Sequence, residues 1–191
     1  MNNSIKLNIK DLIITLLLTL TVSNLHSAQI DGVEFKDIYS SPSGNLNLRG
    51  YSILNYMVVI KAYAGALYLK PSTNSDQALS AAPRILELYY FHKIAADDFR
   101  KSTIEMIKQN IDSAGYQRIE NHIDNFNTFY RDVIPGDRYR AEYSPENGTT
   151  LYLNGKLLGT IKGDEFSKAF FSIWIGRNPI DKKFRDRLLG R

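Results

Sequence analysis

Hydrophobic and polar residues alternate with a period of two along much of the first half of the chain, a pattern typical of β-strands. An early strand is predicted with Val33, Phe35 and Ile38 on one face. The run 46–69 is rich in β-branched and aromatic residues and predicts two or more further strands. The run 84–91 continues the alternation, and its two sides carry Ile85, Glu87, Tyr89 and Phe91, and Leu86, Leu88 and Tyr90, respectively.

From about residue 96 the hydrophobic period lengthens to that of an amphipathic helix. Helices are predicted over 96–114, 118–133, 164–176 and 180–190, with a strand over 139–143 and a hairpin that turns at Asn154-Gly155. We expect Asp97 or Asp98 to cap the first helix, Asp164 to cap the third, and Asn178-Pro179 to begin the last. Strands and helices in separate runs predict an α+β domain in which helices cover one face of a large antiparallel sheet.

The third predicted helix is unusually aromatic, and this raises the question of what its side chains contact. Its main apolar stripe consists of Phe166, Ala169, Phe170, Ile173 and Trp174, which predicts packing against the sheet. Phe171 and Ile175 fall outside that stripe, so they are candidates for a second surface.

The first residues have the pattern of a secretory signal peptide. Lys6 and Lys10 precede the apolar run 12–22, which is followed by polar and then small residues. We therefore predict a signal peptide over 1–28, with cleavage after Ser27 or Ala28, a mature domain over 29–191, and a periplasmic or secreted location. The alternative is an uncleaved anchor, but the apolar run is about half the roughly 20 residues that a membrane span requires.

Charge and composition exclude several classes of function. The net charge is +4, and removal of the leader lowers it to about +3, without a basic stripe of the kind that binds nucleic acid. The chain has no cysteine, and the histidines of the mature chain, His92 and His122, lie far apart, so neither a metal site nor a cofactor is expected. The sequence also lacks a serine-nucleophile elbow, a dinucleotide-binding motif and a phosphate-binding loop.

Tyrosines and one arginine are the remaining candidates for a site. The chain has 12 tyrosines, several of them on predicted strands, and tyrosine suits a cleft for an amphipathic ligand because it combines an apolar ring with one polar atom. Arg49 lies within the apolar strand region, where it either clamps a carboxylate or extends to water at a strand edge. The next residue, Gly50, and likewise Gly65, marks a position where the strand bends or another backbone comes close.

Three segments together resemble the chalcone isomerase-like family, in particular its secreted bacterial branch. They are "IKAYAGALYL", "FYRDVIPGDRYRAEYSPENGTTLYLNG" and "NGKLLGTIKGDEFSKAFFSIWIGRNPIDKKFRDRLLG", and the resemblance covers roughly residues 30–190. The resemblance implies an open-faced β-sandwich, in which helices cover one face of a large antiparallel sheet. This agrees with the order of the predicted elements.

The resemblance does not imply the activity of the plant enzymes, which close a flavanone ring with the help of an arginine, a threonine, a tyrosine and an asparagine. The place of the threonine falls at or near Tyr63, and Arg49 is out of register with the arginine. Phe99 and Met106 occupy the places of the tyrosine and the asparagine. Because the developing enolate charge would lose its fixed donors, we expect no chalcone isomerase activity.

Related non-catalytic members bind fatty acids between sheet and helices, and this resemblance predicts a small hydrophobic ligand here. The expected ligand-binding residues are Arg49, Tyr51, Tyr63, Phe99 and Met106. One alternative is an isomerase or lyase of another substrate that uses Arg49 and Tyr63 as catalytic residues. A second alternative is a structural or partner-binding protein whose cleft is filled by its own side chains. The sequence does not indicate an oligomeric state.

Overall fold

The computed structural model describes residues 27–41, 44–56 and 60–191. Residues 1–26, which make up most of the predicted signal peptide, lie outside the described residues, so that peptide stays a prediction. Within the described ranges, no helix combines the length and the hydrophobicity needed to cross a membrane.

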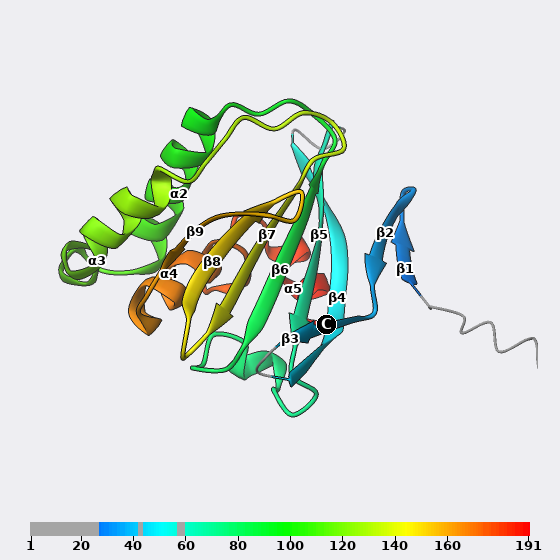
Figure 1. The fold of residues 1–191 in the computed structure, drawn as a ribbon, viewed down its shortest axis with the longest axis horizontal. Helices are drawn as coiled ribbons and strands as arrows, with labels where there is room; N and C mark the ends of the chain where they lie inside the picture. The colour runs from blue at the N-terminus through cyan, green and yellow to red at the C-terminus, as the bar shows by residue number, and fades with distance from the viewer. Residues whose placement is uncertain (1–26, 42–43, 57–59) are drawn as a thin grey trace, which may run out of the picture.

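The centre of the fold is a seven-stranded antiparallel sheet with the strand order β3-β4-β5-β6-β7-β8-β9 (Figure 1). The sheet curls into an open half-barrel, and each strand pairs with its neighbours along the chain. This confirms the predicted α+β fold. The strands are β3 (Ile38–Ser41), β4 (Gly44–Tyr56), β5 (Ile60–Leu69), β6 (Arg84–Tyr90), β7 (Arg138–Ser144), β8 (Gly148–Leu153) and β9 (Lys156–Ile161).

A separate two-stranded hairpin, β1 (Ser27–Ile30) and β2 (Val33–Lys36), precedes the sheet. Val33 and Phe35 are buried as predicted, whereas Ile38 is 49% exposed. The prediction of one continuous strand is therefore wrong. The chain turns at Asp37, whose carbonyl accepts a hydrogen bond from the Leu48 amide at 2.8 Å, and β3 then pairs with β4.

Within the part of the chain that the structure describes, four helices and a short 3-10 turn, η1 (Ser75–Gln77), accompany the strands. The helices α2 and α3 lie at the β9 side of the sheet, and α4 and α5 lie behind it in Figure 1. Their bounds are α2 (Ala96–Asn110), α3 (Ser113–Asn127), α4 (Asp164–Ile175) and α5 (Lys182–Leu188).

The helix ends differ from the predictions because other residues act as caps. Asp112 accepts a hydrogen bond from the Gly115 amide at 2.7 Å, so Gly115 belongs to the start of α3 and does not end α2. Asp97 and Asp98 lie inside the first turn of α2, and the Ala96 amide is bound instead by Asp132. Gly163 precedes the first residue of α4, so Asp164 is not its cap but lies within the helix. Asp181 precedes α5, so this helix begins beyond Asn178-Pro179.

Each face of the sheet carries its own hydrophobic cluster, as the alternation predicts. Leu86, Leu88 and Tyr90 of β6 face the helices, while Ile85 belongs to a smaller cluster under the β1–β2 hairpin. In α4 the predicted stripe is buried except for the half-buried Trp174. Phe171 and Ile175 are buried as well, so the expectation that they form a second surface is wrong.

Two close contacts fix the helical layer to the sheet. A Cβ atom at Gly50 would lie 2.0 Å from the carbonyl oxygen of Arg187, so β4 and α5 approach each other as closely as their backbones allow. At Gly159 on β9, a Cβ atom would lie 2.3 Å from the ring of Phe129, which follows α3. These two contacts therefore set the spacing between the sheet and the helical layer at β4 and at β9.

Candidate functional site

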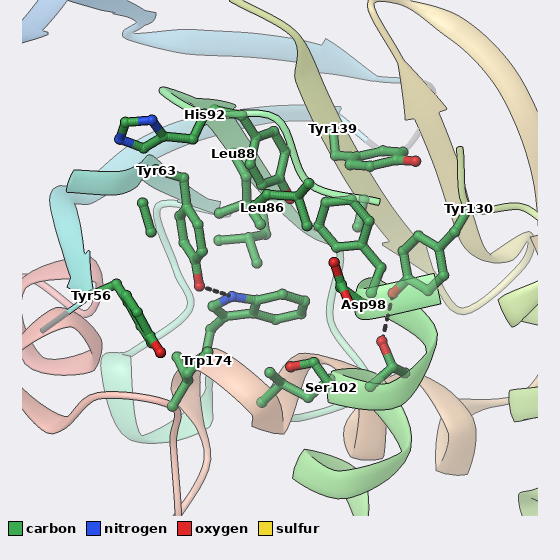
Figure 2. A pocket seen from close by; sticks show the side chains of 18 of the residues that line it. Tyr56, Tyr63, Leu86, Leu88, His92, Asp98, Ser102, Tyr130, Tyr139 and Trp174 are labelled. Carbon is green, nitrogen blue, oxygen red and sulfur yellow. Dashed lines mark hydrogen bonds between the residues drawn. The ribbon is translucent and has the colours of Figure 1, made fainter. Parts of the chain in front are cut away.

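A cavity of about 590 Å³ lies between the sheet and the helices α2 and α4 (Figure 2). Its floor comes from β5 to β8 and its opposite walls come from the first two turns of α2 and the last two of α4. Most of the lining is aliphatic or aromatic, which is the composition expected of a site for an apolar ligand. The lining residues are Tyr56, Ile60, Ala62, Tyr63, Leu86, Leu88, Tyr90, His92, Ile94, Asp98, Phe99, Ser102, Thr103, Tyr130, Tyr139, Ala141, Leu151, Phe170, Ile173, Trp174 and Ile180.

Tyr63 and Trp174 join the sheet to α4 across one wall of the cavity. The Trp174 indole N–H donates a hydrogen bond to the Tyr63 hydroxyl at 3.0 Å, as Figure 2 shows. Tyr63 also packs edge-to-face on Tyr90, its partner on the adjacent strand, with the ring centroids 5.6 Å apart. The indole and phenol rings therefore present fixed apolar surfaces to the cavity.

Polar atoms elsewhere in the wall are mostly satisfied by the protein itself. Thr103 and Tyr130 share a hydrogen bond of 2.8 Å between their hydroxyls. The Tyr139 hydroxyl donates to the carbonyl of Arg131 at 2.8 Å and accepts from its amide at 2.7 Å. The Tyr90 hydroxyl makes no hydrogen bond within the described residues, so it remains available to a ligand.

Burial keeps these phenols protonated at neutral pH. Desolvation raises the pKa of Tyr63, Tyr90 and Tyr130, and the hydrogen bonds from Trp174 and Thr103 only partly oppose this effect. Neutral hydroxyls donate and accept hydrogen bonds but do not act as bases, so the wall of the cavity is suited to binding.

The mouth of the cavity is formed by exposed residues from four segments. Tyr56 and Ile60 lie at the ends of β4 and β5, His92 follows β6, and Asp98 and Ser102 lie on α2. Ile180, between α4 and α5, is 37% exposed at the same opening. Among the described lining residues, those at this rim carry the carboxylate and the imidazole of the site, and those of the interior carry no group that is charged at neutral pH.

Two of the five predicted ligand-binding residues line this cavity. Tyr63 forms part of the floor, and Phe99 stacks on Tyr130 with ring centroids 5.4 Å apart. Their roles toward a ligand stay predictions.

The other three predicted residues lie elsewhere. Arg49 occupies a β-bulge beyond the end of β3, where its guanidinium donates to the carbonyl of Thr73 at 2.5 Å. Tyr51 packs in the cluster on the opposite face of the sheet. Met106 is buried on the same stripe of α2 as Phe99 but about two turns further along, beyond the end of the cavity. Tyr63 therefore lines the cavity and Arg49 does not, and the isomerase or lyase alternative stays a prediction.

Several lining residues are not singled out by the sequence. It predicts a capping role for Asp97 or Asp98 and a place in the apolar stripe for Trp174, and it gives His92 no role in the site. The alternation in β6 does place Tyr90 beside Leu86 and Leu88, and this was the one available signal. The remaining residues meet only through the packing of distant segments.

The described residues contain no cluster of three or more His, Asp or Glu side chains able to hold a metal ion. The ionisable residues at the mouth, His92 and Asp98, come from different segments and do not form such a cluster.

Comparisons with known proteins agree with this geometry. The sequence profile of the chalcone isomerase-like family matches residues 27–190. Among solved structures, a fatty-acid binding protein from Arabidopsis thaliana superposes with a TM-score of 0.68 at 14% sequence identity, covering 86% of this chain and 96% of its own. A search of curated proteins gave no match. Because the family profile spans nearly the whole described chain, this protein belongs to the chalcone isomerase-like family.

Proposed function

We propose that this protein is an exported, non-catalytic member of its family that binds a small hydrophobic ligand between the sheet and the helices. The observation that carries this proposal is the cavity of about 590 Å³ with its largely apolar lining. Binding pockets for small molecules commonly measure roughly 300–1,000 Å³. The alternative in which the cleft is filled by the protein's own side chains does not fit a cavity of this size.

The lack of isomerase activity is supported by the residues at the expected catalytic places. Phe99 has no hydroxyl to donate, and Arg49 is held by the Thr73 carbonyl away from the cavity. A reaction that builds up enolate charge depends on fixed donors near that charge. The high pKa of the buried tyrosines also argues against their use as general bases at neutral pH.

The fatty-acid binding role of the Arabidopsis protein supports a hydrophobic ligand in general. At 14% identity, the likeness extends to the fold alone. The ligand class of this chain therefore has to be argued from its own residues.

Trp174 offers a direct test, since it is the single tryptophan of the chain and it lines the cavity. We expect the intrinsic fluorescence to change saturably when the protein is titrated with 1-decanol, because a bound alkyl chain changes the surroundings of the indole. The substitution Ala141→Phe fills the cavity from the sheet side and should abolish the change.

The matched control is Ala81→Phe, the same substitution at an exposed position outside the cavity. Melting curves of both variants, followed by circular dichroism, verify that each one folds. Equal titration curves for the wild type and a folded Ala141→Phe variant would contradict binding in this cavity.

Export is the second part of the proposal, and it is supported by the basic, apolar and small-residue order of the N-terminus. N-terminal sequencing of the protein from a periplasmic extract should begin at Ala28 or Gln29. An intact Met1 in the membrane fraction would favour the uncleaved anchor instead.

A further inference from the structure

We infer that the cavity prefers amphiphiles with an uncharged head that donates a hydrogen bond, such as an alcohol or a phenol, over fatty-acid anions. This inference rests on the proposed function, because it specifies the ligand of the same cavity.

The charges of the residues around the cavity do not suit an anionic head. The described lining of the cavity contains one carboxylate, Asp98, and no lysine or arginine. A carboxylate that enters an apolar site without a cationic partner loses its hydration and gains no compensating charge. An uncharged hydroxyl loses much less, because the Tyr90 hydroxyl at the wall has no other partner within the described residues.

Three arginines that could otherwise bind a fatty-acid anion already donate hydrogen bonds within the protein. Arg49 donates to the Thr73 carbonyl at 2.5 Å, and the Nε of Arg100 donates to the Asn127 carbonyl at 3.1 Å. Arg131 donates through Nη1 to the carbonyls of Thr128 and Tyr130 at 2.8 and 2.9 Å. Each guanidinium is thus anchored to backbone carbonyls, and none of the three lines the cavity.

The start of α2 lies at the mouth of the cavity. A helix N-terminus attracts anions through its free amides and its dipole. Here the Ala96 amide already donates to Asp132 at 2.9 Å, and Asp97 and Asp98 occupy the first turn. This end of the helix is therefore already complemented by carboxylates, and its amides and dipole offer a fatty-acid anion little further attraction.

Asp98 then has a specific role at the mouth, where Figure 2 shows it between the walls of the cavity. Its carboxylate makes no ion pair within the described residues, in contrast to Asp97, which binds Lys101 at 2.7 Å. A carboxylate accepts hydrogen bonds, so it can accept one from the hydroxyl of an alcohol or a phenol, and its charge repels an ionised fatty acid. Asp98 thus discriminates in two ways: its carboxylate attracts an uncharged hydroxyl head, and its negative charge repels an ionised head.

The test compares two probes of the same chain length, 1-decanol and decanoate, at pH 7.5, where the acid is ionised. Binding is followed by Trp174 fluorescence in the full-length protein. We expect decanol to bind at least about tenfold more tightly than decanoate, since burial of an unpaired charge is costly. Equal affinities, or tighter binding of decanoate, would overturn the inference and leave the proposed function intact. If neither probe binds, the proposed function fails and the inference fails with it.

Two neighbouring substitutions locate the cause. Asp98→Asn should tighten decanoate binding about two- to threefold at low ionic strength, because it removes an exposed like charge. Asp97→Asn is the matched control, since it removes a carboxylate from the same helical turn outside the cavity. Tightening by the same factor in both variants would overturn the role of Asp98.

Discussion

Arg84, at the start of β6, is fully buried and is stacked between two aromatic rings. Its guanidinium carbon lies 4.4 Å from the centroid of Tyr143 and 4.9 Å from that of Phe171. It donates hydrogen bonds to the carbonyls of Ala78 and Ser80 and to the hydroxyl of Ser167. Because burial disfavours the charged form, the pKa of Arg84 falls to about 10. This side chain ties the loop before β6 to α4.

We predict that Arg84→Met lowers the free energy of unfolding by about 2–4 kcal/mol. Methionine fills much of the volume, but the three acceptors lose their donor, and two of them, the Ala78 carbonyl and the Ser167 hydroxyl, remain buried. Urea denaturation measures the change. Arg177→Met, at an exposed residue, should change stability by less than about 0.5 kcal/mol. A loss below about 1 kcal/mol for Arg84→Met would contradict this role.

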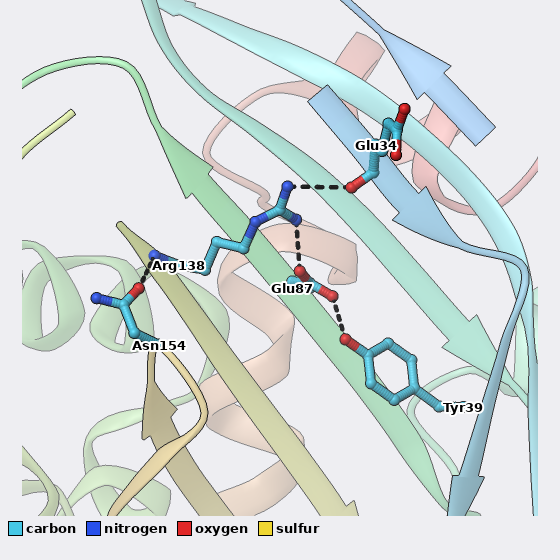
Figure 3. A network of polar contacts seen from close by, with 5 residues as sticks. All are labelled: Glu34, Tyr39, Glu87, Arg138 and Asn154. Carbon is cyan, nitrogen blue, oxygen red and sulfur yellow. Dashed lines mark hydrogen bonds and ion pairs between the residues drawn. The ribbon is translucent and has the colours of Figure 1, made fainter. Parts of the chain in front are cut away.

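At the scale of the elements, polar contacts join the β1–β2 hairpin to the sheet, and Arg138 provides the central one (Figure 3). The guanidinium of Arg138 binds Glu87 at 2.6 Å and donates to the carbonyl of Glu34 at 3.0 Å. Glu87 is buried on β6 and also accepts a hydrogen bond of 2.5 Å from Tyr39. The ring of Phe35 packs against the same guanidinium. One arginine thus links the hairpin to β3, β6 and β7.

We predict that Arg138→Met increases hydrogen exchange across residues 27–36 and lowers the free energy of unfolding by about 2–4 kcal/mol, because a buried carboxylate loses its cation. Arg118→Met is the control. It breaks an ion pair with Glu165 in which both side chains are at least half exposed, and such pairs contribute about 0–1 kcal/mol. Unchanged exchange in the hairpin of Arg138→Met would show that apolar packing alone holds it.

Features of the elements that follow from the local sequence were predictable, whereas features set by distant residues were not. The two sides of β6 were predictable because each side faces a different hydrophobic cluster, which leaves a period of two in the sequence. The start of α2 was not, since Asp132, which binds the Ala96 amide there, lies 36 residues further along the chain. A bulge likewise displaced Arg49, and a single extra residue in a strand carries no reliable pattern.

The residues of the site likewise differ in whether the sequence alone could locate them. Tyr63 and Phe99 were located through the family resemblance, and both line the cavity. The mouth combines the ends of β4 and β5, the segment after β6, the first turns of α2 and the segment after α4. No local pattern marks such a meeting of distant segments, so Asp98 and His92 acquired their significance only from the fold.

At the scale of the whole molecule, the buried tyrosines determine how stability depends on pH. Burial raises the pKa of Tyr63, Tyr68, Tyr90 and Tyr130 above the ordinary value, and that of Tyr143 to about 12. The folded state therefore holds these protons more tightly than the unfolded state does. Their contribution to stability is complete below about pH 10, the usual tyrosine value, and is lost as the pH rises toward the folded values.

Arg84 acts in the opposite direction, because its pKa is lower in the folded state. Its unfavourable contribution is relieved between about pH 10 and the unfolded value of 12.5. With several tyrosines opposing one arginine, we predict that the melting temperature falls steeply between about pH 10 and 11.5. Melting curves by circular dichroism, together with tyrosinate absorbance at each pH, measure this. Ionisation of all 12 tyrosines near pH 10 with the fold retained would contradict it.

The contact between Gly159 and Phe129 has a consequence for how copies of this protein behave at high concentration. A sheet that does not close into a barrel leaves two outer strands, and outer strands invite pairing with another chain. The strand β3 offers only four residues for such pairing. The strand β9 is longer, but Phe129 lies against Gly159 so closely that even a methyl group would not fit there. The ring of Phe129 thus packs one face of β9 against the segment after α3, and we expect a bulkier residue at position 159 to loosen this outer strand and favour its pairing with another copy.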